Sequence, residues 1–155
     1  MEQPPLSGEI MRFDSPTETI FYTIEQTIKE YRKFAQKKIG ELITDLSLDQ
    51  ALILIIISEN PKLLQTQVAE LIFKDYASIT RMLDLMVKNG YIKREANKED
   101  RRRSYLRITA KGRKAIDQLQ PIILNNRKTA LDGLSEKEIN TLEKTLKKIV
   151  SNCNP

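Results

Sequence analysis

The segment Gln65–Thr109, QTQVAELIFKDYASITRMLDLMVKNGYIKREANKEDRRRSYLRIT, decides the fold of this chain. Its first half contains two short runs with apolar residues at helical spacing, Gln65–Phe73 and Tyr76–Asn89, which are separated by a turn at Lys74-Asp75. Gly90 follows the second run, at the position where a left-handed helix cap is expected. Two short helices joined by a tight turn predict a helix-turn-helix unit.

Each of these expected helices has an apolar face that we predict to be buried, made of Val68, Leu71 and Ile72 on the first and Ile79, Leu83 and Met86 on the second. The second helix also has a polar face with Arg81, Asp84 and Lys88. Ser78 and Thr80 lie near its N-terminal end. Because base edges are recognised by donors and acceptors near the start of such a helix, this pattern predicts a helix that reads the major groove.

The second half of the segment predicts a β-hairpin. Residues 91–95 (YIKRE) and 105–109 (YLRIT) alternate as strands do, and they flank a charged turn, ANKEDRRRS. We expect Arg101, Arg102 and Arg103 at the tip of this hairpin. Guanidinium groups suit phosphates and narrow minor grooves because they are planar, always charged and carry several donors. A basic hairpin directly after a helix-turn-helix predicts a winged helix.

The charge of the chain is concentrated in the same region. Residues 88–114 contain eleven Lys/Arg and three acidic residues, a net charge of +8, whereas the rest of the chain carries a net −3. A localised basic region on a slightly acidic body favours a polyanionic partner, double-stranded DNA in this context. A basic loop that is merely solvated would have the same composition, so the surrounding architecture has to decide.

The flanking sequence predicts long helices around this unit. Residues 1–16 hold three prolines and predict an irregular arm, and 17–45 predict a long helix that Gly40 ends or bends. The lobe spans 46–110 and begins with a capping box, Ser47 to Gln50, that opens a buried helix. Residues 111–150 predict two helices, the first kinked at Pro121 and the second opened by a capping box at 135–138.

We therefore expect a mainly α (α+β) fold, a winged helix-turn-helix with N- and C-terminal dimerisation helices. The winged helix needs only about half of the chain, so the apolar stripes of the flanking helices lack a core to fill within one copy. Packing against a second copy in a homodimer is the economical solution, and a twofold dimer matches a palindromic site.

Several function classes are disfavoured by composition. The chain of 155 residues has no histidine, a single cysteine, Cys153, and five scattered glycines. The usual general base, metal ligands and nucleotide-cradling loop are thus missing, and we expect no enzyme, no cofactor and no metal site. No apolar run is long enough to cross a membrane, and the first residues do not resemble a secretory signal, so we expect a cytoplasmic protein.

In order and spacing the chain resembles the MarR family of bacterial transcription regulators over residues 17–150. The resemblance rests on seven motifs: Leu46-Ser-Leu-Asp-Gln50, Gln67-Val-Ala-Glu-Leu71, Ser78-Ile-Thr-Arg-Met-Leu-Asp84, Lys88-Asn-Gly-Tyr-Ile-Lys-Arg94, Asp100-Arg-Arg102, Leu106-Arg-Ile-Thr-Ala-Lys-Gly112 and Leu134-Ser-Glu-Lys-Glu138. Each motif alone is weak, whereas the ordered set is specific.

The resemblance implies a homodimer that binds a pseudo-palindromic operator, commonly as a repressor, and releases it when a small aromatic or anionic effector binds between the dimerisation helices and the lobe. It places Thr80 and Arg81 in the major groove and Arg102 in the minor groove. It also implies that Asp100 orients the wing arginines by ion pairing.

Other residues remain open between a binding role and a structural one. Thr66, Gln67, Lys74, Ser78 and Lys88 are further candidates for DNA contacts, and some equally suit capping or surface positions; the strand residues Lys93, Arg94 and Arg107 are solvated or touch phosphates. Tyr22, Tyr31 and Phe34 line a ligand cavity or are simply core.

Two departures from the family pattern stand out. Leu85 and Val87 occupy positions of the second helix that are usually polar, and we expect them to pack against the wing or a neighbouring part of the lobe. Cys153 lies in the tail, where a thiol switch is poorly supported. A winged helix that binds protein without sequence-specific DNA binding is the alternative function.

Overall fold

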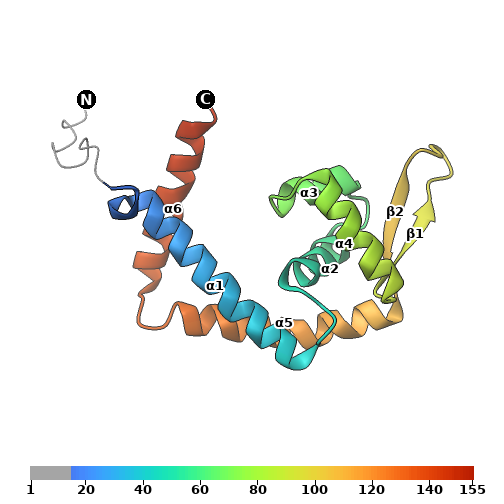
Figure 1. Cartoon of the computed structure of the whole chain (residues 1–155), viewed down its shortest axis with the longest axis horizontal. Coiled ribbons are helices and arrows are strands. Elements are labelled where there is room, and N and C mark those ends of the chain that lie inside the picture. Colours follow the sequence, from blue (N-terminus) through green and yellow to red (C-terminus); the bar gives the residue numbers. More distant parts are fainter. Residues whose placement is uncertain (1–14) are drawn as a thin grey trace.

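Two long helices extend from a small lobe that carries a projecting hairpin, and a third long helix begins at the far end of one of them (Figure 1). The computed structural model describes residues 15–155. The long helices are α1 (Ile20–Leu42), α5 (Ala110–Ala130) and α6 (Glu136–Cys153), and a 3-10 turn η1 (Pro16–Glu18) precedes α1. The lobe contains α2 (Leu48–Glu59), α3 (Gln65–Leu71), α4 (Tyr76–Lys88), β1 (Ile92–Ala96) and β2 (Ser104–Ile108). The element types and their order agree with the predicted winged helix-turn-helix.

The ends of the helices follow from local capping. The two predicted capping boxes are present, at Ser47 with Gln50 and at Ser135 with Glu138. Gly90, just after the end of α4, has a φ of 79°, which is the left-handed conformation that the sequence predicts for a helix cap at this position. The prediction for the start of α1 was three residues early, because Thr19 caps the helix and Pro16 begins η1 instead. Most of the expected N-terminal arm lies outside the described residues.

Gly40, which was expected to end or bend its helix, and Pro121, which was expected to kink its helix, both lie inside helices. α1 continues past Gly40 to Leu42, and α5 includes Pro121. The two strands pair antiparallel from Ile92↔Ile108 at the base to Ala96↔Ser104 near the tip. Both strands therefore lie one residue closer to the tip than predicted.

The core of the lobe surrounds α2, which is buried along most of its length. Ile53 and Leu54 of α2 are fully buried beside residues from every neighbouring element, including Ile39, Val68, Ile79, Leu83, Met86, Ile92, Leu106 and Leu119. Full burial of one such side chain contributes about 1.5–3 kcal/mol. The lobe, the wing and the first half of α5 consequently share one core, which holds the recognition elements in a defined arrangement.

One predicted core residue is wrong. Leu71 is 54% exposed, whereas Ala69 is buried beside Val68 and Ile72. Residues 68, 69 and 72 of a helix occupy one side, and a side chain at 71 points roughly 110° away from their centre. Leu71 therefore faces solvent.

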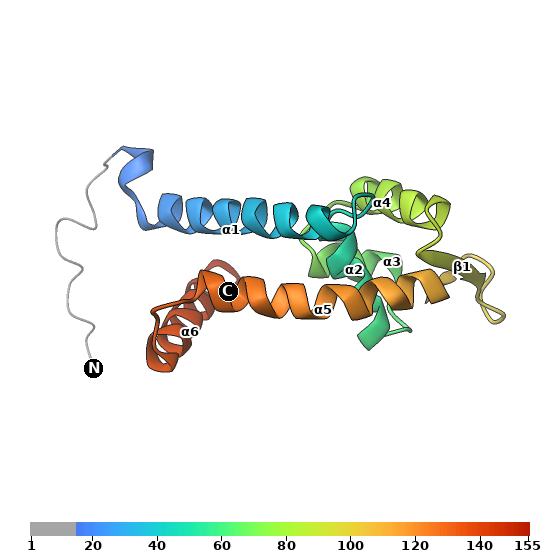
Figure 2. The same ribbon diagram turned by 90° about the horizontal axis from the view of Figure 1, so that it is seen from below.

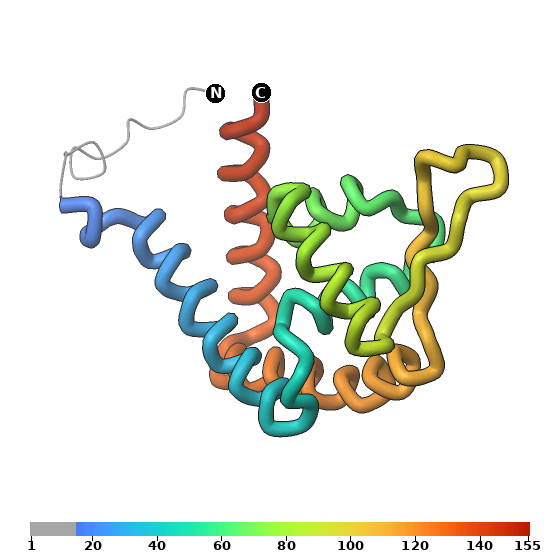
Figure 3. Tube along the Cα trace, turned by 45° about the vertical axis from the view of Figure 1, so that its right-hand side comes forward, coloured from blue at the N-terminus to red at the C-terminus, as the bar shows by residue number. Residues whose placement is uncertain are grey.

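The far end of the long-helix region is open. α6 has no buried residue and makes only marginal contact with the other described elements. Figures 2 and 3 show α1 and α6 as separate rods, and in Figure 3 the two diverge from one another. None of the helices among residues 15–155 combines the length and the apolar character needed to span a membrane.

Candidate nucleic-acid interface

The N-terminus of α4 is rigidly capped by Asp75. Its carboxylate accepts hydrogen bonds from the backbone N of Ser78 at 2.8 Å and from the Ser78 hydroxyl at 2.7 Å. These bonds from Ser78 hold the pKa of Asp75 below its ordinary value. The Ser78 hydroxyl, a predicted DNA contact, thus already has a partner within the helix cap.

A chain of polar contacts joins α3, α4 and β1. Gln65 donates through Nε2 to the Thr80 hydroxyl at 2.7 Å, and Thr80 donates to the backbone oxygen of Tyr76 at 2.9 Å. Arg94 donates to Gln65 Oε1 at 3.1 Å and to Asp84 Oδ1 at 2.8 Å. Thr80 therefore has partners in the lobe, and Arg94 connects the wing to the polar face of α4.

Sequence reasoning left Arg94 open and did not identify Gln65. One signal for Arg94 was available, since it lies two residues after the buried Ile92 and therefore on the same face of the strand as Ile92. No comparable local signal marks Gln65, because its partners are 15 and 29 residues away.

Other predicted contacts divide into occupied and free side chains. Gln67 caps α3 by accepting from the backbone N of Leu64 at 2.8 Å, and Lys74 lies 3.5 Å from Asp49, which also pairs with Arg32 of α1. Thr66, Arg81 and Lys88 are exposed. Within residues 15–155 the Arg81 guanidinium has no hydrogen bond or ion pair.

The wing turn is organised by two short polar side chains. Asn97 Oδ1 accepts from the backbone N of Glu99 at 2.9 Å, and Asp100 Oδ1 accepts from that of Arg102 at 3.0 Å. Asp100 also forms an ion pair with Arg103 at 3.3 Å. The side chains of Arg101 and Arg102 are exposed and have no such partner in the described part of the chain.

The base of the wing is fastened by Arg107. Its guanidinium donates to Glu95 at 2.9 Å and to the backbone oxygen of Pro61 at 2.8 Å, and it lies 4.7 Å from the centre of the Tyr105 ring. Arg107 therefore holds the wing to the α2–α3 loop, while Lys93 is exposed.

An open hollow of about 270 Å³ lies between the helix-turn-helix and the wing. Its lining brings Thr66 at the start of α3 and Tyr76 at the start of α4 together with Arg102 and Arg103 of the wing. The structure therefore gathers three predicted residues, Thr66 of α3 with Arg102 and Arg103 of the wing, around one concave surface that Tyr76 of α4 also lines. Phe73, in the turn before α4, is 93% exposed with a φ of 59°.

The remaining candidates lie elsewhere. Tyr22 borders an open hollow along α1, and Tyr31 and Phe34 are half-buried on the same helix outside the lining of that hollow. The expected packing of Leu85 and Val87 is wrong, because they are 46% and 37% exposed, whereas Leu83 and Met86 of the same helix are fully buried. Cys153 is exposed at the end of α6, and residues 15–155 contain no cluster of potential metal ligands.

Several solved structures that share this architecture are those of transcription regulators. A sequence model of the MarR family matches residues 44–103. A mutant of MarR from E. coli in complex with operator DNA has 23% sequence identity and a TM-score of 0.79, over 88% of this chain and 98% of that chain. A SlyA-like transcription regulator from Listeria monocytogenes has 26% identity and a TM-score of 0.77, over 88% of this chain and 89% of that chain.

A third solved structure is that of BpsR from Bordetella bronchiseptica, with 15% identity and a TM-score of 0.79 over 88% of this chain and 96% of that chain; at this identity the likeness concerns the fold alone. The match at residues 44–103 covers the helix-turn-helix and most of the wing. Together with the agreement in fold over nearly the whole chain, this match supports a MarR-family winged helix-turn-helix regulator.

Proposed function

We propose that the protein is a homodimeric, sequence-specific DNA-binding regulator that acts in the cytoplasm on a pseudo-palindromic operator. The observation that carries this proposal is the contrast among its basic side chains. Arg94, Arg103 and Arg107 are tied to partners in the helix-turn-helix or within the wing, whereas Arg81, Arg101 and Arg102 are exposed and have none among residues 15–155. Free guanidinium groups on a folded basic surface suit phosphates and base edges.

The geometry supports a division of labour on the DNA. Arg81 is the free donor of α4 for the major groove. Thr80 accepts a hydrogen bond from Gln65 and thereby holds α4 against α3. The wing tip presents Arg101 and Arg102, with Asp100 shaping the turn from which they project. An arginine at this place suits the narrow minor groove beside the reading helix.

The dimer is supported by apolar side chains that one copy leaves exposed. They gather on the helices outside the lobe: Ile20, Phe21 and Ile28 at the start of the chain, Leu124 and Leu131 on and after α5, and Leu142 and Val150 on α6. Twofold pairing buries the same surface on both copies and presents two α4 helices to two half-sites.

Repression and release by a small molecule complete the proposal. MarR from E. coli has been solved with operator DNA, and regulation of DNA binding by 6-hydroxynicotinic acid is described for BpsR. For this chain we propose the same kind of control, with an aromatic or anionic effector binding near α1.

Binding to the DNA that flanks its own gene tests the function. We expect footprints on a palindromic sequence, and an affinity that falls steeply with salt because phosphate contacts release counterions. Arg102→Ala should lower the affinity by at least about tenfold and leave the dimer intact; the matched control is Lys144→Ala, an exposed lysine of α6. Absence of any shift at low salt would favour the protein-binding alternative.

A further inference from the structure

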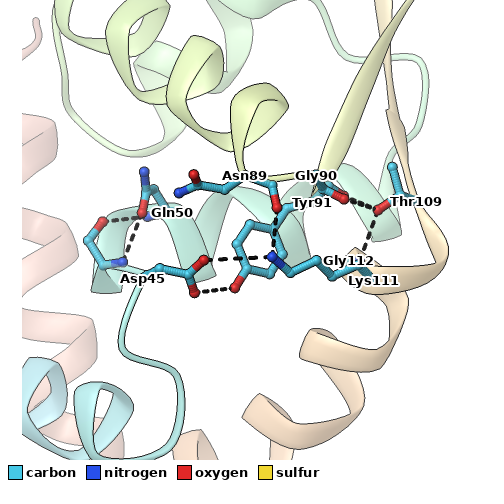
Figure 4. A network of polar contacts seen from close by, with 9 residues as sticks. Asp45, Gln50, Asn89, Gly90, Tyr91, Thr109, Lys111 and Gly112 are labelled. Atoms are coloured by element: carbon cyan, nitrogen blue, oxygen red, sulfur yellow. Dashed lines mark hydrogen bonds and ion pairs between the residues drawn. The ribbon is translucent and has the colours of Figure 1, made fainter.

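Three segments that are far apart in the sequence meet at the ring of Tyr91 (Figure 4). They are the loop between α1 and α2, which contributes Asp45; the junction between α4 and β1, which contributes Asn89, Gly90 and Tyr91; and the end of β2 with the start of α5, which contributes Thr109, Lys111 and Gly112. We call these seven residues the Tyr91 joint. They lie where the wing leaves the lobe.

Two side chains contact Tyr91, Asp45 at its hydroxyl and Lys111 at the face of its ring. The ring is buried, with Tyr91 2% exposed, and its hydroxyl donates to Asp45 Oδ1 at 2.5 Å. Lys111 places its ammonium 4.3 Å from the ring centre, donates to the backbone oxygen of Asn89 at 2.7 Å and lies 3.6 Å from Asp45 Oδ2. A buried phenol that donates a hydrogen bond to a carboxylate is held in place both by packing and by the directional geometry of that hydrogen bond.

The start of α5 also contacts the backbone at Gly90 and Tyr91 directly. The backbone N of Thr109 donates to Tyr91 O at 3.1 Å, its hydroxyl lies 2.5 Å from Gly90 O, and Gly112 N donates to that hydroxyl at 3.1 Å. A Cβ at Gly112 would lie 2.2 Å from Tyr91 O, so α5 approaches this peptide as closely as a residue without a side chain allows. Both ends of the wing are thus bound to the first turn of α5.

The link to α1 has a different character. The hydrogen bond of Tyr91 and the ion pair of Lys111 both end on Asp45, which is half exposed and lies in the loop that directly follows α1. One carboxylate therefore connects the end of α1 to the wing base and to α5 at once. The tip of the wing lies far from this point (Figure 1), so a small rotation at the joint moves the tip by a larger distance.

We propose that Tyr91 and Asp45 are positioning residues for operator binding, which set the angle between the winged-helix lobe and the α1–α5 scaffold. This inference rests on the proposed function. In a twofold dimer that angle determines the separation of the two α4 helices, and half-site spacing follows from it. The hydroxyl–carboxylate bond thus contributes to the choice of spacing without touching DNA.

The test compares wild type, Tyr91→Phe, Asp45→Ala and the double variant on the footprinted operator and on versions with one base pair added or removed between the half-sites. Wild type should lose at least about tenfold in affinity on the altered spacings. Tyr91→Phe should bind the native spacing about tenfold more weakly and discriminate less between spacings, and the double variant should add no further loss.

Asp117→Ala, which removes an exposed carboxylate of α5 outside the joint, controls for the change of charge in Asp45→Ala. Wild-type spacing preference in Tyr91→Phe, with or without a uniform loss of affinity, would overturn the proposal. A second readout does not require DNA. Spin labels at Lys98→Cys and Lys128→Cys in a Cys153→Ser background should give a narrow distance distribution, which Tyr91→Phe broadens or shifts; an unchanged distribution would overturn the joint even if wild type proved not to bind DNA.

Discussion

Tyr91 shows how one buried side chain links protonation to stability. Burial, followed by the hydrogen bond to Asp45, raises the pKa of Tyr91 to about 12 from its ordinary value of 10.0. Between these pH values the unfolded chain has lost the phenolic proton that the folded chain still holds. The free energy of unfolding should therefore be constant with respect to this group below pH 10 and fall by up to about 1.4 kcal/mol per unit from pH 10 to about 12.

Urea unfolding of wild type and Tyr91→Phe at several pH values measures this contribution. Lysines also titrate in the range, so the difference between the two proteins isolates the phenol. The variant should be less stable than wild type near neutral pH by about 1–3 kcal/mol, because it lacks the bond to Asp45. That deficit should shrink as the pH rises to 12, and a deficit independent of pH would contradict the assigned pKa.

At the same scale, the sequence predicted residue types better than residue partners. Arg101, Arg102 and Arg103 were grouped correctly at the wing tip because a turn is a local feature. The bond of Arg94 to Asp84 and Gln65, and that of Arg107 to Pro61, required knowledge of which strands and loops become neighbours. Partners of this kind depend on tertiary packing, which a local pattern does not contain.

At the scale of the elements, we expect substitution by alanine at two helical glycines to change the free energy of unfolding in opposite directions. Gly112 in the first turn of α5 abuts Tyr91 O, and a Cβ there would also lie 2.8 Å from a methyl carbon of Ile108. Gly112→Ala should therefore lower the free energy of unfolding by about 2–3 kcal/mol, since backbone and core have to move apart. Gly40 lies inside α1 with no atom within 4 Å of such a Cβ. Gly40→Ala should raise stability by about 0.5–1 kcal/mol through helix propensity.

Chemical denaturation of both variants measures the pair. Each exchange adds one methyl group to a helical glycine, so the two differ chiefly in surroundings. A neutral Gly112→Ala would mean that α5 does not approach the wing base as closely as described. A strong loss in Gly40→Ala would show that α1 is covered at this position, which a single copy does not explain.

Elements were predictable wherever their signals were local. Both capping boxes and the left-handed Gly90 follow from side-chain chemistry within four residues, and they fix the starts of α2 and α6 and the end of α4. Leu71 was misplaced because α3 has only seven residues, so several choices of buried face fit its pattern almost equally well. Neighbouring elements decide which face such a short helix buries.

At the scale of the whole molecule, α6 is an amphipathic helix whose apolar face makes only marginal contact with other parts of the described chain. Ile139, Leu142, Leu146 and Ile149 form its apolar stripe, yet none of its residues is buried. An exposed stripe of this length is typical of a helix that packs against another chain. The sequence already predicted a dimer from this surplus of apolar stripes, and the open end of the described structure is consistent with that prediction.

Leu142→Glu tests the dimer at this helix. Leu142 is exposed in one copy, so the change should leave the thermal stability of the lobe core unaffected. A carboxylate buried in the twofold interface has to be desolvated, and we expect it to weaken dimerisation by at least about tenfold in sedimentation equilibrium. Operator affinity should fall in parallel, because two half-sites no longer bind as a unit. Asn140→Glu introduces the same charge on the opposite side of α6 and should leave the dimer intact. Equal dimer strength in both variants would place α6 outside the interface and leave its apolar stripe to a different partner.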